Sequence, residues 1–504
     1  MSPRLSSIEQ IYDQIGGLSW FHLIMVILIE FIKSMLGWSM MIMSYAGYIN
    51  DFLCIPPPGN SPTVAGLYSR EEDTLNGTTV NVCKVNGTKC EQFRFLGSKQ
   101  TAISEWHLVC DLRWMKAVII SVQMCGVLAG NTLGGLSGDY FGRKKTLYTS
   151  ILLHTFLNII AAYSVSWQMF AVTRFFIGLL IGIILMMAVT LLAELLPMRW
   201  RHLGPVIPSW PLGVMCFAGV AALLENWAYL HIVCAVLSGL FVLGFFYVPE
   251  SPRWLATQGR LEESYSVLEK IARANKKPMP PSAMDVIQRI ADDERTKYQG
   301  KKYTYKDLFT TRTTIKVTVI FSLEWIIMSI IFYGLNFGVS SFVGNLYINI
   351  FIMNAIQIPA ALVNFGVIDR FGRRTTSISF MALATIASFI CVGTHLAAAE
   401  SMRGSVSSLL CLIAQLLVSG CWTTATVWVV ESYPTVVRSL GFGFSSMSAR
   451  VGAIIAPFII NLVSSYVGWT LQWSAGCTLQ CLAWWTLQWL AGWALQCLAW
   501  WTLQ

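Results

Sequence analysis

Three ionisable side chains stand out near the centres of long apolar stretches of this 504-residue chain: Glu30, Glu324 and Arg450. A charge near the centre of a bilayer costs about 2.5–3.5 kcal/mol on insertion scales, so such residues commonly mark a substrate or ion pathway. The guanidinium of Arg450 could bind a carboxylate through two parallel hydrogen bonds, and the glutamates could attract a cationic group. The alternative is that each charge pairs with a structural partner. For Glu30 that partner would be Lys33, one helical turn further along the chain.

Aromatic residues in the apolar stretches could form the walls of a binding site. Tyr333 and Trp428, with Trp210, Trp325 and Trp422, have ring faces that attract cations, although packing and lipid contact are the alternative. One arginine and two glutamates in one cavity would suit a zwitterion or a cation better than an anion. The six histidines lack metal-ligand spacing, and no phosphate loop or nucleophile constellation is present. We therefore expect no metal, no cofactor and no enzymatic activity.

The elements that position these residues are apolar segments of about 20 residues, the length that crosses a hydrocarbon core as a helix. Only 12% of the residues are charged, against about 25% in soluble proteins, and most of the charges lie in the segments 51–113 and 249–316. This excludes a soluble enzyme, a secreted disulfide-rich domain and a disordered regulator, and it predicts an all-α polytopic membrane protein. The eleven clear spans are 20–43, 114–137, 147–165, 168–192, 205–224, 228–248, 317–338, 344–367, 376–397, 405–430 and 441–463.

Short loops set the orientation of these spans. Arginine and lysine follow the second, fourth, eighth and tenth spans, whereas the alternate loops are nearly free of them. By the positive-inside rule the N-terminus is cytoplasmic and the segment 51–113 is extracellular. The net charge of +9 is therefore an orientation signal, and we expect no nucleic-acid partner. The outer segment carries glycosylation sequons at Asn76 and Asn86 and four cysteines that could pair in three ways: Cys54, Cys83, Cys90 and Cys110.

An internal repeat divides the chain. The loop Gly138–Lys144 after the second span is echoed by Ile368–Arg374 after the eighth, and Glu194–Arg199 is echoed by Glu431–Arg438. Such repeats are typical of secondary transporters. We predict a cytoplasmic N-terminus (1–19), a six-helix half (20–248) that includes the extracellular loop 51–113, a cytoplasmic loop (249–316), a second half with five clear spans (317–466) and a tail (467–504).

Acids and arginines of the repeated loops are expected at the inner membrane face, where the two halves would meet. Charge pairs that form between the halves when the inner gate is shut, and break when it opens, would give a two-state element. The alternative is that these residues serve only as orientation signals. The predicted gate residues are Asp139, Arg143, Glu194, Arg199, Asp369, Arg373, Glu431 and Arg438.

These loop motifs resemble the signature of the major facilitator superfamily. More narrowly, the chain is similar to the organic anion, cation and carnitine transporters, also called solute carrier family 22. The resemblance covers about 1–466 and rests on the end of the outer loop (Glu105–Cys110), on Pro249–Leu255 after the sixth span and on Glu431–Arg438. It implies a major facilitator fold of two six-helix repeats and a transporter that works by alternating access.

The resemblance also bears on substrate charge. Arg450 matches the position where the anion and carnitine branches have arginine and the cation branch has aspartate. The anion branch has a lysine where this chain has Ala361, so an anion would lose one of two cationic contacts. In the first repeated loop, Tyr140 stands where the family usually has arginine, which weakens the expected ion-pair gate of the first half.

The tail departs from the family pattern. A tetrapeptide of the type Trp-Thr-Leu-Gln begins at 469, 477, 485, 493 and 501, a strict period of eight without any charge. Because eight residues advance a helix by about 80°, this period gives no fixed helical face. We interpret 467–504 as low-complexity sequence in place of an ordinary twelfth span, with an aromatic membrane anchor as the alternative.

The sequence therefore predicts a polyspecific secondary transporter of small organic ions in the plasma membrane, with zwitterionic or cationic, carnitine-like substrates. Organic anion transport or exchange is the close alternative. A truncated paralogue without transport activity, or a membrane scaffold, is the alternative of another class. The substrate-binding candidates are Arg450, Glu324, Glu30, Tyr333 and Trp428. Besides substrates and the bilayer, self-association through the extracellular loop is an open alternative.

Overall fold

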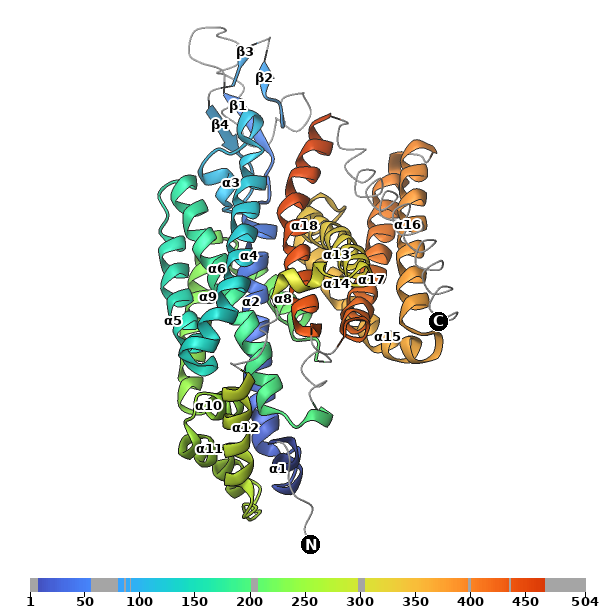
Figure 1. The fold of residues 1–504 in the computed structure, drawn as a ribbon. Coiled ribbons are helices and arrows are strands. Elements are labelled where there is room, and N and C mark those ends of the chain that lie inside the picture. The colour runs from blue at the N-terminus through green and yellow to red at the C-terminus, as the bar shows by residue number, and fades with distance from the viewer. Residues whose placement is uncertain are drawn as a thin grey trace.

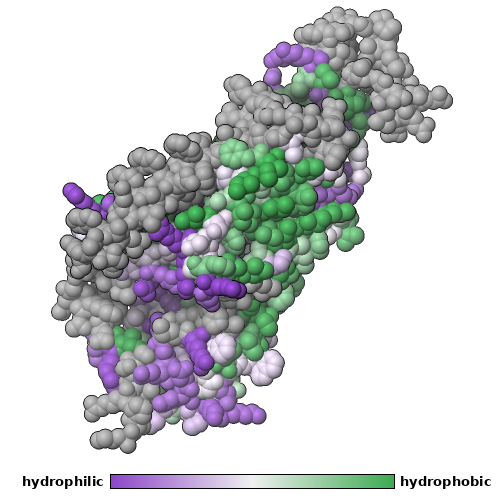
Figure 2. Space-filling view, turned by 90° about the vertical axis from the view of Figure 1, so that its right-hand side faces the viewer, coloured by the Kyte–Doolittle hydropathy of each residue, from purple (hydrophilic) through white to green (hydrophobic). Residues whose placement is uncertain are grey.

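The computed structural model describes residues 8–55, 80–85, 88–90, 92–200, 207–297, 304–397, 400–434 and 437–466. The predicted glycosylation sites Asn76 and Asn86 and the tail 467–504 lie outside these residues. Eight of the described helices are long and apolar enough to cross a membrane. Figure 2 shows a broad band of hydrophobic side chains on one face of the molecule. These features confirm the predicted all-α polytopic membrane fold.

The first group of membrane helices, which we call the N-group, corresponds to the first six predicted spans. Its helices are α2 (Trp20–Ala46), α4 (Met115–Phe141), α5 (Arg143–Ala162), α6 (Trp167–Leu195), α8 (Ser209–Leu224) and α9 (Trp227–Val242). Glycines allow α4 and α6 to approach each other closely. A Cβ atom on Gly130 would lie 2.0 Å from the carbonyl oxygen of Leu179, and one on Gly178 would lie 2.1 Å from that of Gln123.

The second group, the C-group, lies beside the first (Figure 1). It contains α13 (Arg312–Gly338), α14 (Leu346–Ala355), α15 (Gln357–Phe371), α16 (Arg373–Ala397), α17 (Glu400–Ser432) and α18 (Arg438–Tyr466). The predicted eighth span is thus two helices, interrupted at Ile356. Pro359 explains the interruption, because a proline cannot donate a backbone hydrogen bond and its ring clashes with the carbonyl four residues earlier, here that of Ala355.

Hydrogen bonds between the two groups lie near the end of the molecule that carries the β-strands. Ser44 donates to the carbonyl oxygen of Asn336 at 3.2 Å, and Ser121 donates to that of Ile454 at 2.7 Å. The hydroxyl of Tyr347 donates to Glu225 at 3.4 Å. Ser44 lies in the last turn of the helix that leads into the strands, and Ser121 lies in the first turns of the helix that follows them. The groups are therefore joined at this end, which we call the strand end.

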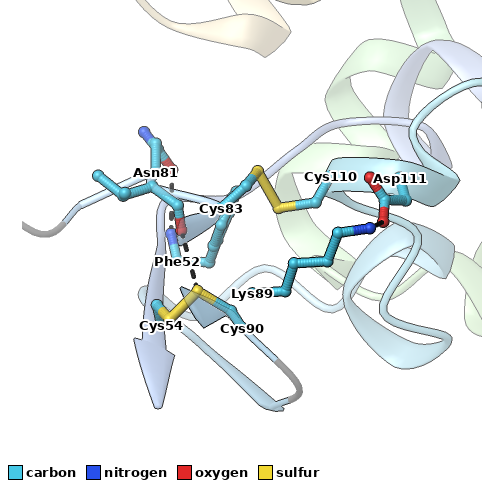
Figure 3. Close-up of a disulfide and its surroundings, with 9 residues drawn as sticks. Phe52, Cys54, Asn81, Cys83, Lys89, Cys90, Cys110 and Asp111 are labelled. Carbon is cyan, nitrogen blue, oxygen red and sulfur yellow. Dashed lines mark hydrogen bonds and ion pairs between the residues drawn. A yellow bond between two sulfur atoms is a disulfide. The ribbon is translucent and has the colours of Figure 1, made fainter. Parts of the chain in front are cut away.

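The strand end is a small disulfide-linked unit (Figure 3). Strand β1 (Phe52–Ile55) pairs antiparallel with β4 (Gln92–Phe95), and β2 (Lys84–Val85) pairs with β3 (Thr88–Lys89). Of the three pairings that the sequence allows, the structure has Cys54–Cys90 and Cys83–Cys110. The short helix α3 (Ala102–Glu105) fixes this unit to the N-group, because the indole of Trp227 donates to Glu105 at 2.6 Å.

Four short helices form a cap at the opposite end of the N-group (Figure 1). They are α1 (Ile8–Gln14), α10 (Pro252–Thr257), α11 (Leu261–Ala274) and α12 (Ala283–Lys297). The cap has its own hydrophobic core, which includes Ile11, Leu268 and Ile287. Single 3-10 turns complete the described elements: η3 (Cys110–Leu112), η4 (Met198–Trp200), η5 (Leu243–Phe246), η6 (Tyr305–Phe309) and η7 (Val339–Ser341).

Candidate functional site

A cavity of about 320 Å³ lies between the two groups of helices. From the N-group it is lined by α2, α6 and the start of α8, and from the C-group by α13, α15, α17 and α18. Its lining residues are Lys33, Leu185, Ile207, Pro208, Ser209, Trp210, Pro211, Phe332, Tyr333, Gln357, Ser419, Trp422, Thr423 and Arg450. Its size and its mixed apolar and polar lining are those of a small-molecule site.

Arg450, a predicted substrate-binding residue, lines this cavity from α18. One terminal nitrogen of its guanidinium donates to the hydroxyl of Tyr333 at 2.7 Å, which fixes the plane of the group. Its Nε atom is buried and has no hydrogen-bond partner among the described residues. As a residue that lines the cavity, Arg450 could compensate the charge of a carboxylate bound there.

Glu30 forms the pair with Lys33 that the sequence offered as the alternative. The ammonium of Lys33 lies 2.8 and 2.7 Å from the two carboxylate oxygens of Glu30. Ser209, the first residue of α8, donates a second hydrogen bond to Glu30 at 2.5 Å. Lys33 lines the central cavity, whereas Glu30 lines a separate, mainly apolar pocket between α2, α8 and α9. The acid is therefore neutralised, and the cation faces the cavity.

Glu324 and Trp428 lie away from the cavity. Glu324 is 1% exposed inside the C-group and accepts a hydrogen bond from Ser377 of α16 at 2.8 Å. Trp428 packs edge-on against Phe321. Neither residue is among those that line the cavity. The sequence favoured a zwitterion or a cation on the condition that two glutamates and one arginine share a single cavity. This condition is therefore not met.

The lining instead combines two cations with aromatic and neutral polar groups. Lys33 and Arg450 are its charged residues, and no acid is among the described residues that line it. Trp210, Trp422 and Phe332 supply aromatic surface. Sequence reasoning missed Gln357, Ser419 and Thr423, because neutral polar residues in apolar spans carry no distinctive signal. The charge of Lys33 was visible in the sequence, but only as a partner for Glu30.

The repeated loops form two equivalent ion-pair clusters, one in each group. In the N-group, Arg143 lies 2.9 Å from Asp139 and 3.2 Å from Glu194. Each loop turns at a glycine with positive φ, Gly142 at +102° and Gly372 at +79°. Residues other than glycine rarely adopt this backbone conformation.

The equivalent C-group cluster has Arg373 at 3.9 Å from Asp369 and 3.0 Å from Glu431. The pairs thus form within each group, and none joins the two groups among the described residues. Arg438 donates to the carbonyl oxygen of Tyr433 at 3.5 Å, and Arg199 is exposed in η4.

The cap covers only the N-group cluster. The indole of Trp254 in α10 donates to the carbonyl oxygen of Asp139 at 2.9 Å, and Tyr12 of α1 donates to that of Glu194 at 3.4 Å. The side chain of Arg143 is accordingly 14% exposed, against 36% for Arg373. Within the cap, Arg253 pairs with Glu9, and burial lowers the pKa of Arg253.

Curated relatives are named as an organic cation transporter or as members of solute carrier family 22. An organic cation transporter protein of Drosophila melanogaster is 28% identical over 401 residues, which cover 77% of this chain and 71% of the relative. Human solute carrier family 22 member 13 is 29% identical, with 71% and 63% covered, and human member 7 is 30% identical, with 70% and 64% covered. The match thus spans less than two thirds of the length of each human relative.

Solved structures show the same fold. The xylose transporter XylE from E. coli, in a partially occluded inward-open conformation, superposes with a TM-score of 0.63 at 15% identity and covers 92% of this chain and 97% of its own. The proton:xylose symporter XylE bound to a bromodeoxyglucose superposes with a TM-score of 0.61, also at 15% identity, over 91% and 94%. A family model described as "Sugar (and other) transporter" matches residues 25–488. The chain therefore belongs to the sugar (and other) transporter family.

Proposed function

We propose that the protein is a secondary transporter that carries small organic ions across the plasma membrane by alternating access, with the cavity between its two groups of helices as the substrate site. The names of its curated relatives support the general class of substrate. The observation that carries the proposal is Arg450, a cation in a cavity that both groups line and that no described acid lines. An ion that binds there would contact both moving parts of the carrier.

The charge of the cavity favours a substrate with a carboxylate. Lys33 and Arg450 line it, and the acid that compensates Lys33 faces a different pocket. A simple cation would meet the charge of Arg450, which no described acid in the lining compensates, and this repulsion costs binding free energy in a site of low dielectric constant. We therefore propose a zwitterion or an organic anion as substrate, rather than a simple cation.

The repeated clusters serve, in this proposal, as the inner gate. The two groups are joined at the strand end, and the described loop clusters form ion pairs only within each group. This arrangement is the one expected when the site opens toward the cap end. We propose that in the opposite state some of these eight gate residues exchange partners across the groups.

The basic loops support a cytoplasmic N-terminus, and the two disulfides support an extracellular strand end. We propose glycosylation at Asn76 and Asn86 on this side. A shift in electrophoretic mobility after treatment with an N-glycosidase would test this, with Asn76→Gln and Asn86→Gln as the matched variants.

Uptake of radiolabelled benzoate, carnitine and tetraethylammonium by oocytes tests the transport proposal. We expect uptake of benzoate or carnitine above that of tetraethylammonium, and loss of that uptake in Arg450→Gln. Retained benzoate uptake in Arg450→Asp would contradict the role of Arg450. Uptake of none of the three, with the protein confirmed at the cell surface, would favour a non-transporting paralogue.

A further inference from the structure

The cavity contains a second cation, contributed by the opposite group of helices. We propose that Lys33 of α2 is a specificity-determining residue that binds the same anionic group of the substrate as Arg450, and that Glu30 holds it until the substrate arrives. This inference rests on the proposed function, and it deepens that function by assigning the anion a contact on each half of the carrier.

The first support is the placement of the ion pair across the wall of the cavity. Lys33 lines the central cavity together with Arg450, and its side chain is 17% exposed. Glu30 is 5% exposed and lines the neighbouring pocket of about 360 Å³, whose other lining residues are mainly apolar. An anion in the cavity would therefore meet Lys33, whereas Glu30 is not among the residues that line this cavity.

The second support is that Glu30 keeps other partners when Lys33 turns away. The hydroxyl of Ser209 donates to Glu30 at 2.5 Å, and Ser34 of α2 donates to the backbone carbonyl of Ser209 at 2.7 Å, so the backbone that carries this hydroxyl is held in place. Ser209 also begins α8, and the first turn of a helix carries a partial positive charge. The loss of one partner would therefore leave the carboxylate hydrogen-bonded.

The chemistry of lysine suits such an exchange. Its ammonium is a compact charge on a flexible stem, which can change partners by rotating about its own side-chain bonds. Arg450 is different, because its guanidinium is fixed by the hydroxyl of Tyr333. The substrate anion would first meet the fixed guanidinium and then draw Lys33 from Glu30, which links binding to a change in the N-group.

Two substitutions with opposite expected effects test the proposal in benzoate uptake. Lys33→Met keeps the apolar stem and removes the charge, so KM should rise by at least about tenfold, as expected for a lost charge-assisted hydrogen bond. Lys33→Arg should retain most of the affinity. Glu30→Gln releases Lys33 from its pair, so KM should fall. The double variant Glu30→Gln/Lys33→Met should match Lys33→Met alone. Lys277→Met, in an exposed turn after α11, is the control for loss of a lysine.

The purely structural alternative makes different predictions. If the pair only neutralises two buried charges, each single variant should lower the amount of protein at the surface, the double variant should restore it, and KM should not change in any of them. That pattern would overturn the inference. Surface biotinylation with every uptake curve separates folding from affinity. If Lys33→Met does not fold, the KM of Glu30→Gln decides: a fall supports the proposal, and an unchanged or higher value overturns it.

Failure of this inference is distinct from failure of the proposed function. Benzoate uptake that requires Arg450 but is indifferent to Lys33 and Glu30 overturns only the role of Lys33. Absence of uptake of benzoate, carnitine and tetraethylammonium by wild-type protein at the surface overturns both.

Discussion

At the scale of single residues, the position of a charge matters more than its presence. Four ionisable residues lie in apolar helices near the site: Glu30, Lys33, Glu324 and Arg450. Two of them line the cavity, one faces a neighbouring pocket and one is enclosed in the C-group. Hydropathy alone gives these four residues equal weight, whereas the structure assigns them different surroundings and therefore different expected roles.

The hydroxyl of Tyr333 should matter for affinity and not for folding. Tyr333→Phe removes the hydrogen bond of 2.7 Å that orients the guanidinium of Arg450 while keeping the ring. We expect KM for benzoate to rise by about threefold to tenfold, the effect of losing one typical hydrogen bond, with unchanged surface expression. Concentration-dependent uptake measures this. Tyr163→Phe, at an exposed helix end, is the matched control. An unchanged KM would contradict the orienting role.

Glu324 should be dispensable as a charge. Its buried carboxylate has the hydroxyl of Ser377 as its hydrogen-bond donor among the described residues. Glu324→Gln keeps the shape and a carbonyl acceptor but removes a charge that is costly to bury. We expect an equal or higher thermal unfolding midpoint of the purified protein and an unchanged KM for benzoate. Loss of uptake with normal surface expression would instead show that Glu324 belongs to an ion pathway.

At the scale of elements, the two loop clusters show how a repeat positions charge. In each group an aspartate at the end of one helix and a glutamate near the end of the next helix but one both pair with the arginine that begins the helix between them. These six residues are among the eight gate candidates that the repeat indicated, whereas Arg199 and Arg438 are not in the ion pairs of the two clusters as described. The sequence could not predict that the pairs form within each group in this state, because identical motifs are compatible with either choice of partner.

The gate proposal predicts rescue between the groups. Arg143→Glu breaks the N-group pairs and should reduce benzoate uptake, and Glu431→Arg in the same chain should restore part of it if the clusters exchange partners in another state. Glu194→Arg, the partner within the N-group, is the comparison. If only Glu194→Arg restores uptake, the clusters are static supports of their own group, and the exchange of partners is wrong.

Helix packing gives a sharper test on α4. A Cβ atom on Gly130 would lie 2.0 Å from a backbone oxygen of α6, whereas one on Gly135 would meet no atom within 4 Å. Gly130→Ala should therefore markedly lower the thermal unfolding midpoint and the surface level. Gly135→Ala should be neutral or stabilising, because alanine favours a helix by about 1 kcal/mol over glycine. Equal effects would show that α4 and α6 are not packed as described.

At the scale of the whole molecule, apolar length and charge placement were sufficient to predict the fold class. Each of the eleven predicted spans corresponds to described helix, although the eighth is divided at Ile356. The interruption of the eighth span, and the direction in which each side chain points, depend on how the helices pack against one another. A single sequence gives no clear pattern for this packing. Lys33 is the clearest example. In the sequence its charge is accounted for by an ion pair with Glu30, so nothing indicates that it also lines the cavity.

The groups are joined at the strand end and share a cavity whose charged lining residues come one from each group. This arrangement makes the bound ion part of the contact between the halves. A carboxylate substrate should therefore cross the membrane when the loaded site reorients from one face to the other. Unlabelled substrate on one side should then accelerate the movement of labelled substrate from the other side.

Counterflow in proteoliposomes measures this most directly. Vesicles that contain the purified protein are loaded with unlabelled benzoate, and the entry of a trace of labelled benzoate is followed over time. We predict transient accumulation of label above equilibrium with the wild type, and none with Arg450→Gln or with vesicles loaded with tetraethylammonium. Absence of counterflow with folded wild-type protein, or equal counterflow with Arg450→Gln, would contradict a carrier whose site is this cavity.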